Sequence, residues 1–347
     1  MTALSSSSII TIKNVATELL GIEHPIVCGG MTATGSAELC AAVANAGCLG
    51  MLTCLHCRTP ERLREEIART RTLTSRPFGV NLTILGEKRG EPEFPAEFAA
   101  VIAEAGIRVV ETCGASLPLM TQLHETLRAG GVEVIISKCV HVRQAVKAQD
   151  VLGADMISLM GWDSGGLPGE ADTGMFVQLA LARKSLRVPF LASGGVATGG
   201  QLLAALAMGA AGVQIGTAFN TTAECSVWPA SFKARMLEAG TRDTVIIMKP
   251  FRASSRVLKN KDAAEILRIQ AEKGSELTFK DIAPLAQFER LREGIAAADP
   301  DRGVWNCGQS VCLLDEVLSC EQFVQRLLSE ARDSLQAVAP MFQPARL

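Results

Sequence analysis

Two short glycine-rich segments carry groups that can hold a phosphate: Ser193-Gly194-Gly195-Val196 and Gln214-Ile215-Gly216-Thr217. Each follows or ends an apolar run typical of a buried strand, and glycine there leaves backbone N–H groups open to an anion. Thr217 adds a hydroxyl donor, and a helix predicted to begin near Gly199 would point its N-terminus at the same anion. Together they predict a phosphate site, and tight turns without a ligand are the alternative.

Residues that could contact the rest of such a ligand follow three other predicted strands. One glycine pair follows the first strand, and a glycine-dense run at residues 161–170 follows the sixth; either could lie against a flat ring system, and the longer run could also close over the site. A lone amide near the end of the third strand could hydrogen-bond a polar ring edge, although a structural turn role is equally expected. The residues concerned are Gly29, Gly30, Met31, Asn81, Gly165 and Gly166.

Histidine and cysteine are the next candidates for chemistry. His56 and His141 each follow a predicted strand and could reach the same face, although a surface or helix-start histidine is the simpler interpretation. The segment Cys54-Leu55-His56-Cys57 contains ligand types that zinc uses, but no second Cys/His pair follows at a suitable spacing. We therefore predict no metal site.

A parallel sheet is needed to bring these residues together. From Pro25 to about Phe219, short β-rich apolar runs alternate with amphipathic helical patterns, which is typical of repeated βα units in an α/β fold. Eight strands are predicted, the number that closes a (β/α)8 TIM barrel, whose sites lie after the C-terminal ends of the strands. Their approximate ranges are 25–29, 49–54, 78–83, 108–113, 132–138, 156–160, 189–193 and 212–216.

The chain divides into four predicted segments. Residues 1–12 form a leader that lacks the features of a signal peptide and is expected to be flexible. Residues 13–222 form the barrel, and residues 223–300 form a mainly helical cap interrupted by the β-rich residues 244–248. Residues 301–347 form a C-terminal segment whose amphipathic helix returns to the barrel.

Composition argues against several classes of function. Of the 347 residues, 48% are hydrophobic and 20% are charged, which supports a large buried core. The net charge of −2 and the lack of a Lys/Arg block predict no nucleic-acid or anionic membrane partner. No apolar run is long enough to span a membrane. The eleven cysteines are odd in number and scattered, so we expect reduced thiols and a cytoplasmic location.

Several of these segments, in this order, resemble the nitronate monooxygenase family, formerly called 2-nitropropane dioxygenases. The resemblance covers most of the chain, and chance similarity over so many separated motifs is improbable. It rests on PIVCGGM (25–31), AGCLG (46–50), PFGVNL (77–82), SKC (137–139), SGGV (193–196), GVQIGT (212–217) and RVLKN (256–260).

The resemblance implies an FMN-dependent oxidoreductase, a TIM barrel with a smaller helical domain that binds FMN without a covalent bond. It implies that the phosphate lies on the two glycine segments and that Met31, Asn81 and Lys138 line the isoalloxazine ring. A cation at Lys138 would stabilise negative charge on the reduced ring, and a solvated lysine at a strand end is the alternative.

One position departs from the family's pattern. The family's motif carries a catalytic histidine in the loop after strand six, and this chain has Leu167 there, in a frame that aligns without a gap. The family's histidine is understood to remove the α-proton of a neutral nitroalkane, and leucine cannot accept a proton. Asp163 and Glu170 lie in the same loop, but exposed carboxylates are weak bases. We expect deprotonation by that route to be absent.

Several functions stay open. Oxidation of an already ionised alkyl nitronate by O2 needs no base. NAD(P)H-dependent reduction of a quinone or an enoyl substrate would suit an apolar pocket beside Trp162 and Leu167. A catalytically degenerate flavin-binding barrel, or a flavin-free enzyme acting on a phosphorylated sugar or nucleotide, would use the same phosphate site. The expected partners are a small apolar or nitronate-like substrate with O2 or NAD(P)H, and a homodimer is left open.

Overall fold

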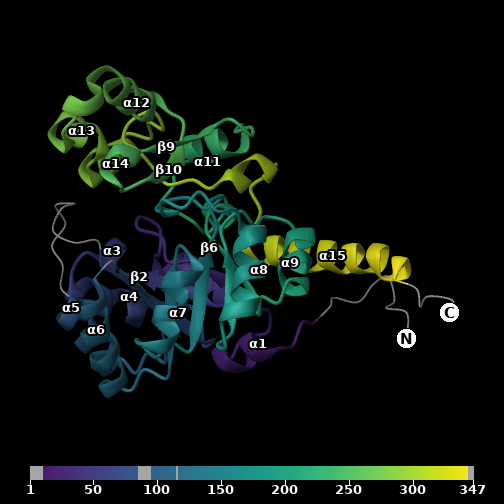
Figure 1. Ribbon diagram of the computed structural model, residues 1–347. Coiled ribbons are helices and arrows are strands. Elements are labelled where there is room, and N and C mark those ends of the chain that lie inside the picture. Colours follow the sequence, from purple (N-terminus) through teal and green to yellow (C-terminus); the bar gives the residue numbers. More distant parts are fainter. Residues whose placement is uncertain (1–10, 85–94, 115, 343–347) are drawn as a thin grey trace.

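Eight parallel strands form a barrel in the computed structural model, which describes residues 11–84, 95–114 and 116–342 (Figure 1). Neighbours in the chain are neighbours in the sheet, and β1 also pairs with β8. An isolated bridge between Val27 and Leu49 joins the first strand to the second. The strands are β1 (Ile26–Cys28), β2 (Gly50–Thr53), β3 (Phe78–Thr83), β4 (Val109–Cys113), β5 (Val134–Cys139), β6 (Met156–Met160), β7 (Phe190–Ser193) and β8 (Gly212–Ile215). The predicted TIM barrel is confirmed.

Helices surround the strands, and their amphipathic faces cover the sheet. They are α2 (Ala37–Asn45), α4 (Pro60–Leu73), α5 (Pro95–Glu104), α6 (Leu117–Ala129), α7 (Val142–Asp150), α8 (Met175–Ser185) and α9 (Gly199–Ala207), with the one-turn helices α3 (Cys54–Cys57) and α10 (Thr217–Asn220). The predicted leader falls mostly on residues 1–10, outside the described residues. After it, α1 (Val15–Leu20) packs against the barrel interior, and the amide of Asn14 donates to the carbonyl of Ala211 over 2.7 Å.

The interior of the barrel changes from apolar to polar along the strands. Residues of the apolar layer, such as Val27, Val109 and Ile136, pack in one cluster with α1. Beyond them, towards the C-terminal ends of the strands, lie fully buried polar side chains, among them Asn81 and Glu111. Buried polar groups require partners, so this layer is a hydrogen-bonded floor on which the site stands.

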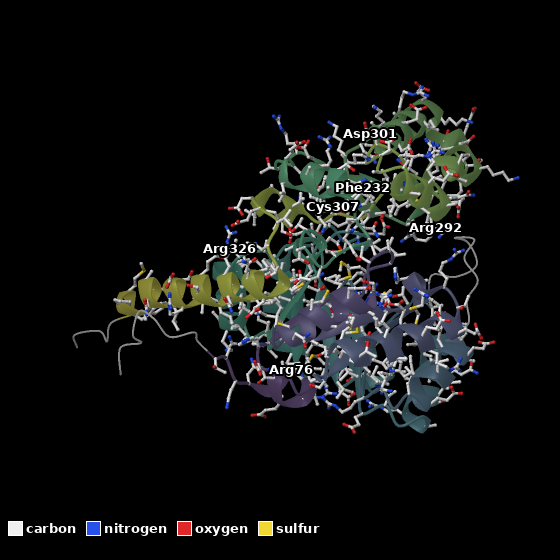
Figure 2. All side chains as sticks on the ribbon, turned by 180° about the vertical axis from the view of Figure 1, so that it is seen from behind. Arg76, Phe232, Arg292, Asp301, Cys307 and Arg326 are labelled. Atoms are coloured by element: carbon white, nitrogen blue, oxygen red, sulfur yellow. The ribbon has the colours of Figure 1, made fainter. Side chains whose placement is uncertain are left out.

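The cap covers the C-terminal end of the barrel (Figure 1). It contains α11 (Ala230–Leu237), α12 (Lys261–Lys273), α13 (Phe279–Ala286) and α14 (Phe288–Ala296), and the antiparallel strands β9 (Thr244–Ile247) and β10 (Ser255–Leu258). Trp228, Phe232 and Trp305 pack with ring centroids 5.2–5.5 Å apart, in one core with Cys307. Figure 2 labels Phe232 and Cys307 of this core. An isolated antiparallel β-bridge pairs Asn306 with Val257 of β10. The predicted domain boundary at residue 300 would therefore separate two segments that pair with each other.

The C-terminal helix α15 (Cys320–Val338) lies along the outside of the barrel beside α9 (Figure 1). Its buried face includes Phe323, Leu327 and Ala331. A search of the described residues finds no helix with the length and apolar character needed to cross a membrane.

Candidate active site

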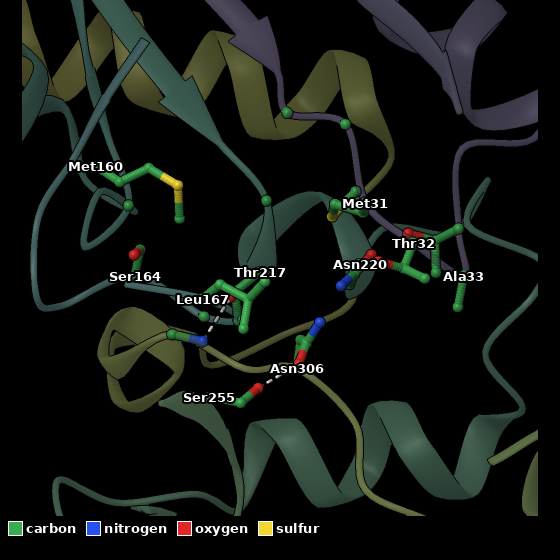
Figure 3. A pocket seen from close by; sticks show the side chains of 18 of the residues that line it. Met31, Thr32, Ala33, Met160, Ser164, Leu167, Thr217, Asn220, Ser255 and Asn306 are labelled. Atoms are coloured by element: carbon green, nitrogen blue, oxygen red, sulfur yellow. Dashed lines mark hydrogen bonds between the residues drawn. The ribbon is translucent and has the colours of Figure 1, made fainter. Parts of the chain in front are cut away.

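A cavity lies between the C-terminal ends of the strands and the cap (Figure 3). The loops after β1, β6, β7 and β8 form its barrel side, and cap residues such as Met248 and Phe288 form the opposite side. Most of the predicted site residues line it. These are Gly29, Gly30, Met31, Lys138, Gly165, Gly166, Leu167, Gly194, Gly195, Gln214, Gly216 and Thr217.

The glycine pair after β7 is required by backbone shape. Gly194 and Gly195 have φ angles of +86° and +75°, which L-residues with a side chain rarely adopt. A methyl group on Gly194 would overlap the side chain of Ser164 in the loop after β6. The N–H of Gly194 donates to the carbonyl of Gln214 over 3.2 Å, so this amide serves the barrel. The tight-turn interpretation therefore explains the presence of both glycines.

The glycine after β8 has a different explanation. Gly216 has a φ of −114°, which any residue adopts, so its backbone does not require glycine. A Cβ there would lie 3.3 Å from the sulfur of Met31, which also lines the cavity. The hydroxyl of Thr217 accepts from the N–H of Gly308 over 2.9 Å, which leaves its own proton available to a ligand. This side of the cavity has the open backbone and the donor that a phosphate needs.

The N-terminus of α9 does not serve the cavity, which corrects the expectation drawn from Gly199. Its N–H donates over 2.7 Å to the carboxylate of Glu330 in α15, and Gly199 packs against the backbone of that helix. The anion at this helix terminus is therefore a side chain of the protein.

Glu111 of β4 is the main site residue that the sequence analysis missed. It is fully buried on the barrel floor. It accepts hydrogen bonds from the Asn81 amide at 2.7 Å, from the Gly30 N–H at 3.2 Å and from the Gln214 amide. One sign was present in the sequence: Glu111 is the lone charged residue in the otherwise uncharged strand VVETC.

Lys138 is paired with that carboxylate. Its ammonium nitrogen lies 2.8 Å from Glu111 Oε1 and donates to the carbonyl of Gly30 over 3.3 Å. The lysine lines the cavity, as predicted, but a buried carboxylate offsets its charge. An ion pair at this place presents a dipole to a bound ring, with the ammonium on the cavity side.

Asn81 and Gln214 support this pair from below. The oxygen of the Asn81 amide accepts from the Thr83 hydroxyl over 2.9 Å, and its nitrogen is bound to Glu111. Asn81 lies directly under Gly30 and is not among the residues that line the cavity, so its contact with a ring edge stays a prediction. The Gln214 amide oxygen accepts from the hydroxyls of Ser193 and Ser158. Both amides therefore hold the Glu111 carboxylate in position at the floor of the cavity.

The cap holds the loop after β6 in place. Gly166 and Arg256 exchange two backbone hydrogen bonds of 3.0 and 2.7 Å. The buried guanidinium of Arg256 also donates to the carbonyl of Trp162 over 3.0 and 3.2 Å and lies 5.6 Å from the centre of its ring. Burial lowers the pKa of Arg256. These contacts fix Leu167 with its side chain at the cavity (Figure 3).

Neither candidate substitute base reaches the cavity. His56 lies in α3, where its Nδ1 donates to the carbonyl of Ala33 over 2.9 Å. His141 caps the N-terminus of α7, where its Nδ1 accepts from the N–H of Gln144 over 3.0 Å. Cys57, in the same turn as His56, is buried, and burial raises its pKa to about 12. Within the described ranges, no three His, Cys, Asp or Glu side chains group as metal ligands.

Two ionisable side chains occur among the described lining residues, Lys138 and Cys113. Burial raises the pKa of Cys113, and the nearby Lys138 charge opposes part of that rise. The Cys113 thiol is therefore protonated at neutral pH.

Cap residues supply polar groups that no local sequence pattern indicated. The hydroxyl of Ser255 donates to the amide oxygen of Asn306 over 3.3 Å (Figure 3). This bond turns the amide nitrogen towards Gly166, which precedes Leu167 in the loop, and Nδ2 lies 3.3 Å from where a Gly166 Cβ would be.

Two buried polar atoms fit the presence of a bound ligand. The hydroxyl of Thr34 and the indole nitrogen of Trp228 have no hydrogen-bond partner among the described residues, and both residues line the cavity. Buried donors are rarely left unpaired, so these groups, with the open Gly216 backbone, suit a polar ligand such as a flavin.

Comparison with known proteins identifies the family. The family model "Nitronate monooxygenase" matches residues 13–330. The chain is 29% identical, over 95% of its length and 99% of the relative's, to (3aS,4S,5R,7aS)-5-hydroxy-7a-methyl-1-oxo-octahydro-1H-indene-4-carboxyl-CoA dehydrogenase of Rhodococcus jostii. It is 27% identical to the nitronate monooxygenase of Paraburkholderia phytofirmans, over 67% of this chain and 73% of that one. The structure of FabK from Thermotoga maritima matches with a TM-score of 0.83 and 30% identity, over 96% of this chain and 100% of that one. The predicted family is confirmed: the chain belongs to the nitronate monooxygenase family of flavin-dependent oxidoreductases.

Proposed function

We propose that the protein is an FMN-dependent oxidoreductase that transfers a hydride between the flavin and an apolar acyl thioester, with NAD(P)H as the second redox partner. The observation that carries the proposal is Leu167. Its apolar side chain stands where the family has a base, and the amide of Asn306 faces the adjoining Gly166. Two relatives aligned over nearly the whole chain support it, because both are named as dehydrogenases of one carboxyl-CoA compound.

The cofactor would lie on the barrel side of the cavity. The backbone at Gly195 and Gly216 and the hydroxyl of Thr217 would hold its phosphate, and Met31 and Lys138 would lie beside its ring. Bound FMN supplies hydride chemistry. The Glu111–Lys138 pair holds its charges in fixed positions beneath the ring, because each of its members has further hydrogen bonds.

The cap side would hold the substrate. Leu167, Met248, Phe288 and Leu291 offer an apolar surface for an acyl chain or ring. The Asn306 amide would donate to the thioester carbonyl, which gains negative charge when a hydride adds to the conjugated double bond. A positioned donor stabilises that charge in the transition state. Ser255 is a positioning residue, because it sets which end of the amide faces the cavity.

A second candidate is oxidation of an alkyl nitronate by O2. A nitronate is already ionised, so Leu167 does not exclude it, and the 27% identity to a nitronate monooxygenase supports it. The two candidates differ in what removes electrons from the reduced enzyme and what supplies them.

Anaerobic mixing separates the two. We expect NADH or NADPH to bleach the flavin absorbance, and a medium-chain 2-enoyl-CoA to restore it. An alkyl nitronate should bleach it slowly or not at all. Bleaching by nitronate alone, with no effect of pyridine nucleotide, would establish the second candidate. Protein that takes up no FMN would contradict both.

A Leu167→His variant tests the missing base directly. A histidine would return a group that titrates near neutral pH, so we expect oxidation of neutral nitroalkanes to rise by about 100-fold or more over the wild type. Leu167→Gln is the matched control, since it adds polarity without a base. Equal rates in the two variants, with FMN bound, would show that a base at this position is not what the site lacks.

A further inference from the structure

We propose that a second cavity, between α6 and α7, binds the phosphorylated adenosine end of a coenzyme. Resting on the proposed function, this inference gives the site a ligand class: a phosphate-bearing adenosine, which coenzyme A thioesters and NAD(P)H both carry. The cavity has a volume of about 420 Å³.

The cavity begins at the C-terminal ends of the strands and extends between α6 and α7. Its inner wall is made by the C-terminal ends of β4 and β5, at Thr112 and at residues 137–139, and its sides by the first turn of α6 and by α7 as far as Leu152, which follows that helix. Lys138 lines this cavity and the flavin cavity alike. A molecule with its reactive end at the flavin could therefore extend its other end past this lysine.

The charge of the cavity has one sign. Its charged lining side chains, among the described residues, are Lys138, Arg143 and Lys147, and no carboxylate lines it. Lys138 is paired with the buried Glu111 behind the wall, so the charge available to a ligand comes from Arg143 and Lys147. Arg143 and Lys147 are four residues apart on α7 and so lie on one side of the helix. The structure gives neither an ion pair with any described residue.

Several exposed cations elsewhere in the chain are paired with carboxylates of their own helix. Arg62 pairs with Glu65 and Glu66 on α4. Arg268 pairs with Glu265 and Glu272 on α12 in the same way. A helix face that is merely solvated mixes both signs, as these do. Arg143 and Lys147, which form no ion pair with a residue that the structure describes, line a cavity without carboxylates and favour an anionic ligand there.

The remaining wall suits a nucleoside. Leu117 and Met120 of α6 and Leu152 after α7 give it an apolar surface. Leu117 keeps 37% of its surface exposed. An adenine could lie against this surface while its phosphates meet Arg143 and Lys147. Apolar contact with a few charged groups is the usual composition of a nucleotide site.

Direct binding to the FMN-loaded enzyme tests the site without any turnover. The probes are adenosine 3′,5′-bisphosphate, which is the nucleotide end of coenzyme A, and ADP, measured by titration calorimetry at low salt. An Arg143→Glu/Lys147→Glu variant should bind at least one probe about tenfold or more weakly. The matched control is Arg242→Glu/Lys280→Glu, two exposed cap residues with the same change of charge, which should bind as the wild type does. Equal binding by both double variants, or no binding by the wild type, overturns the inference.

Kinetics then identify the coenzyme. If the site serves a thioester, the variant raises KM for an enoyl-CoA about tenfold and leaves KM for the corresponding enoyl-pantetheine and the rate of flavin reduction by NAD(P)H unchanged. If it serves NAD(P)H, the change falls on flavin reduction alone. A third outcome separates the two proposals. If probe binding depends on Arg143 and Lys147 but no thioester reoxidises the reduced enzyme, the proposed function is refuted and this binding site is retained. Unchanged constants for both coenzymes would overturn the site as a coenzyme subsite.

Discussion

The two sides of the cavity between the barrel and the cap differ in which atoms line them. The β7/β8 side presents backbone, with two positive-φ glycines and Gly216, while the β6-loop and cap side presents side chains such as Leu167 and Asn306. A backbone site depends on conformation and tolerates little change, whereas a side-chain site changes its chemistry with one substitution. A single substitution on the side-chain side could therefore change the chemistry of the cavity while its backbone side stays the same.

The first prediction adds a side chain at a glycine on the β7/β8 side of the cavity. Gly216→Val would direct its side chain towards Met31 and the phosphate position. We expect FMN affinity to fall about 100-fold or more, because steric exclusion of a phosphate removes several hydrogen bonds at once. Flavin fluorescence titration measures the affinity. Gly240→Val, at an exposed glycine with room for a side chain, should bind FMN normally. Normal binding by Gly216→Val would show that the phosphate lies elsewhere.

The floor shared by both sides tests a buried ion pair. Glu111→Gln leaves the Lys138 ammonium without its carboxylate at a site where the lysine side chain is 11% exposed. We expect the free energy of unfolding to fall by about 3 kcal/mol, measured by urea denaturation. Glu104→Gln is the control, since Glu104 also lies 2.8 Å from its partner Arg64 but both are exposed, and it should cost under about 1 kcal/mol. Glu111→Gln/Lys138→Met should regain part of the loss. Equal effects at the two sites would contradict the burial argument.

A smaller change tests the side-chain side. Asn306→Ala removes the proposed donor to the thioester carbonyl, so kcat with an enoyl-CoA should fall by about 10- to 100-fold, while flavin reduction by NAD(P)H stays unchanged. Ser255→Ala frees the amide to rotate and should give a smaller fall in kcat with little change in KM. If both steps slow equally in Asn306→Ala, the residue supports the cavity's shape and not the substrate's carbonyl.

The smallest expected effect concerns pH, and it comes from a buried histidine next to the second cavity. His124 Nδ1 donates to the Leu152 carbonyl over 3.0 Å, and Nε2 lies 2.9 Å from the Thr112 hydroxyl. Burial lowers the pKa of His124 below its ordinary 6.5. As the pH falls through 6.5, the His124 ring therefore binds a proton in the unfolded chain before it does so in the folded protein. The free energy of unfolding is highest above that pH and falls as the pH approaches the lower pKa of the folded state.

Thermal unfolding between pH 5 and 7.5 measures this loss. One histidine changes the free energy of unfolding by at most about 1.4 kcal/mol per pH unit, and His124→Gln should reduce this slope. The half-buried His24, whose pKa burial also lowers, gives the comparison variant His24→Gln. An unchanged slope in His124→Gln would mean that folding does not lower the pKa of the His124 ring.

Much of the fold was readable because its signals are local. All eight strands lie within a few residues of their predicted ranges, since parallel strands buried on both faces are short apolar runs between turn residues. The glycine segments were readable for the same reason, because positive φ at Gly194 and Gly195 leaves no other residue type. Asn81 lies on the predicted strand β3, but its depth below Gly30 depends on how the barrel closes, which the sequence does not show.

The amino-acid sequence was sufficient to predict the barrel and the family, because strand patterns and aligned motifs need no knowledge of distant contacts. Three contacts are visible only in the folded chain: Glu111 with Lys138, Glu330 with the N-terminus of α9, and Asn306 with Gly166 beside Leu167. Each of these joins residues far apart in the chain. Their meeting depends on barrel closure and cap docking, which no local pattern encodes.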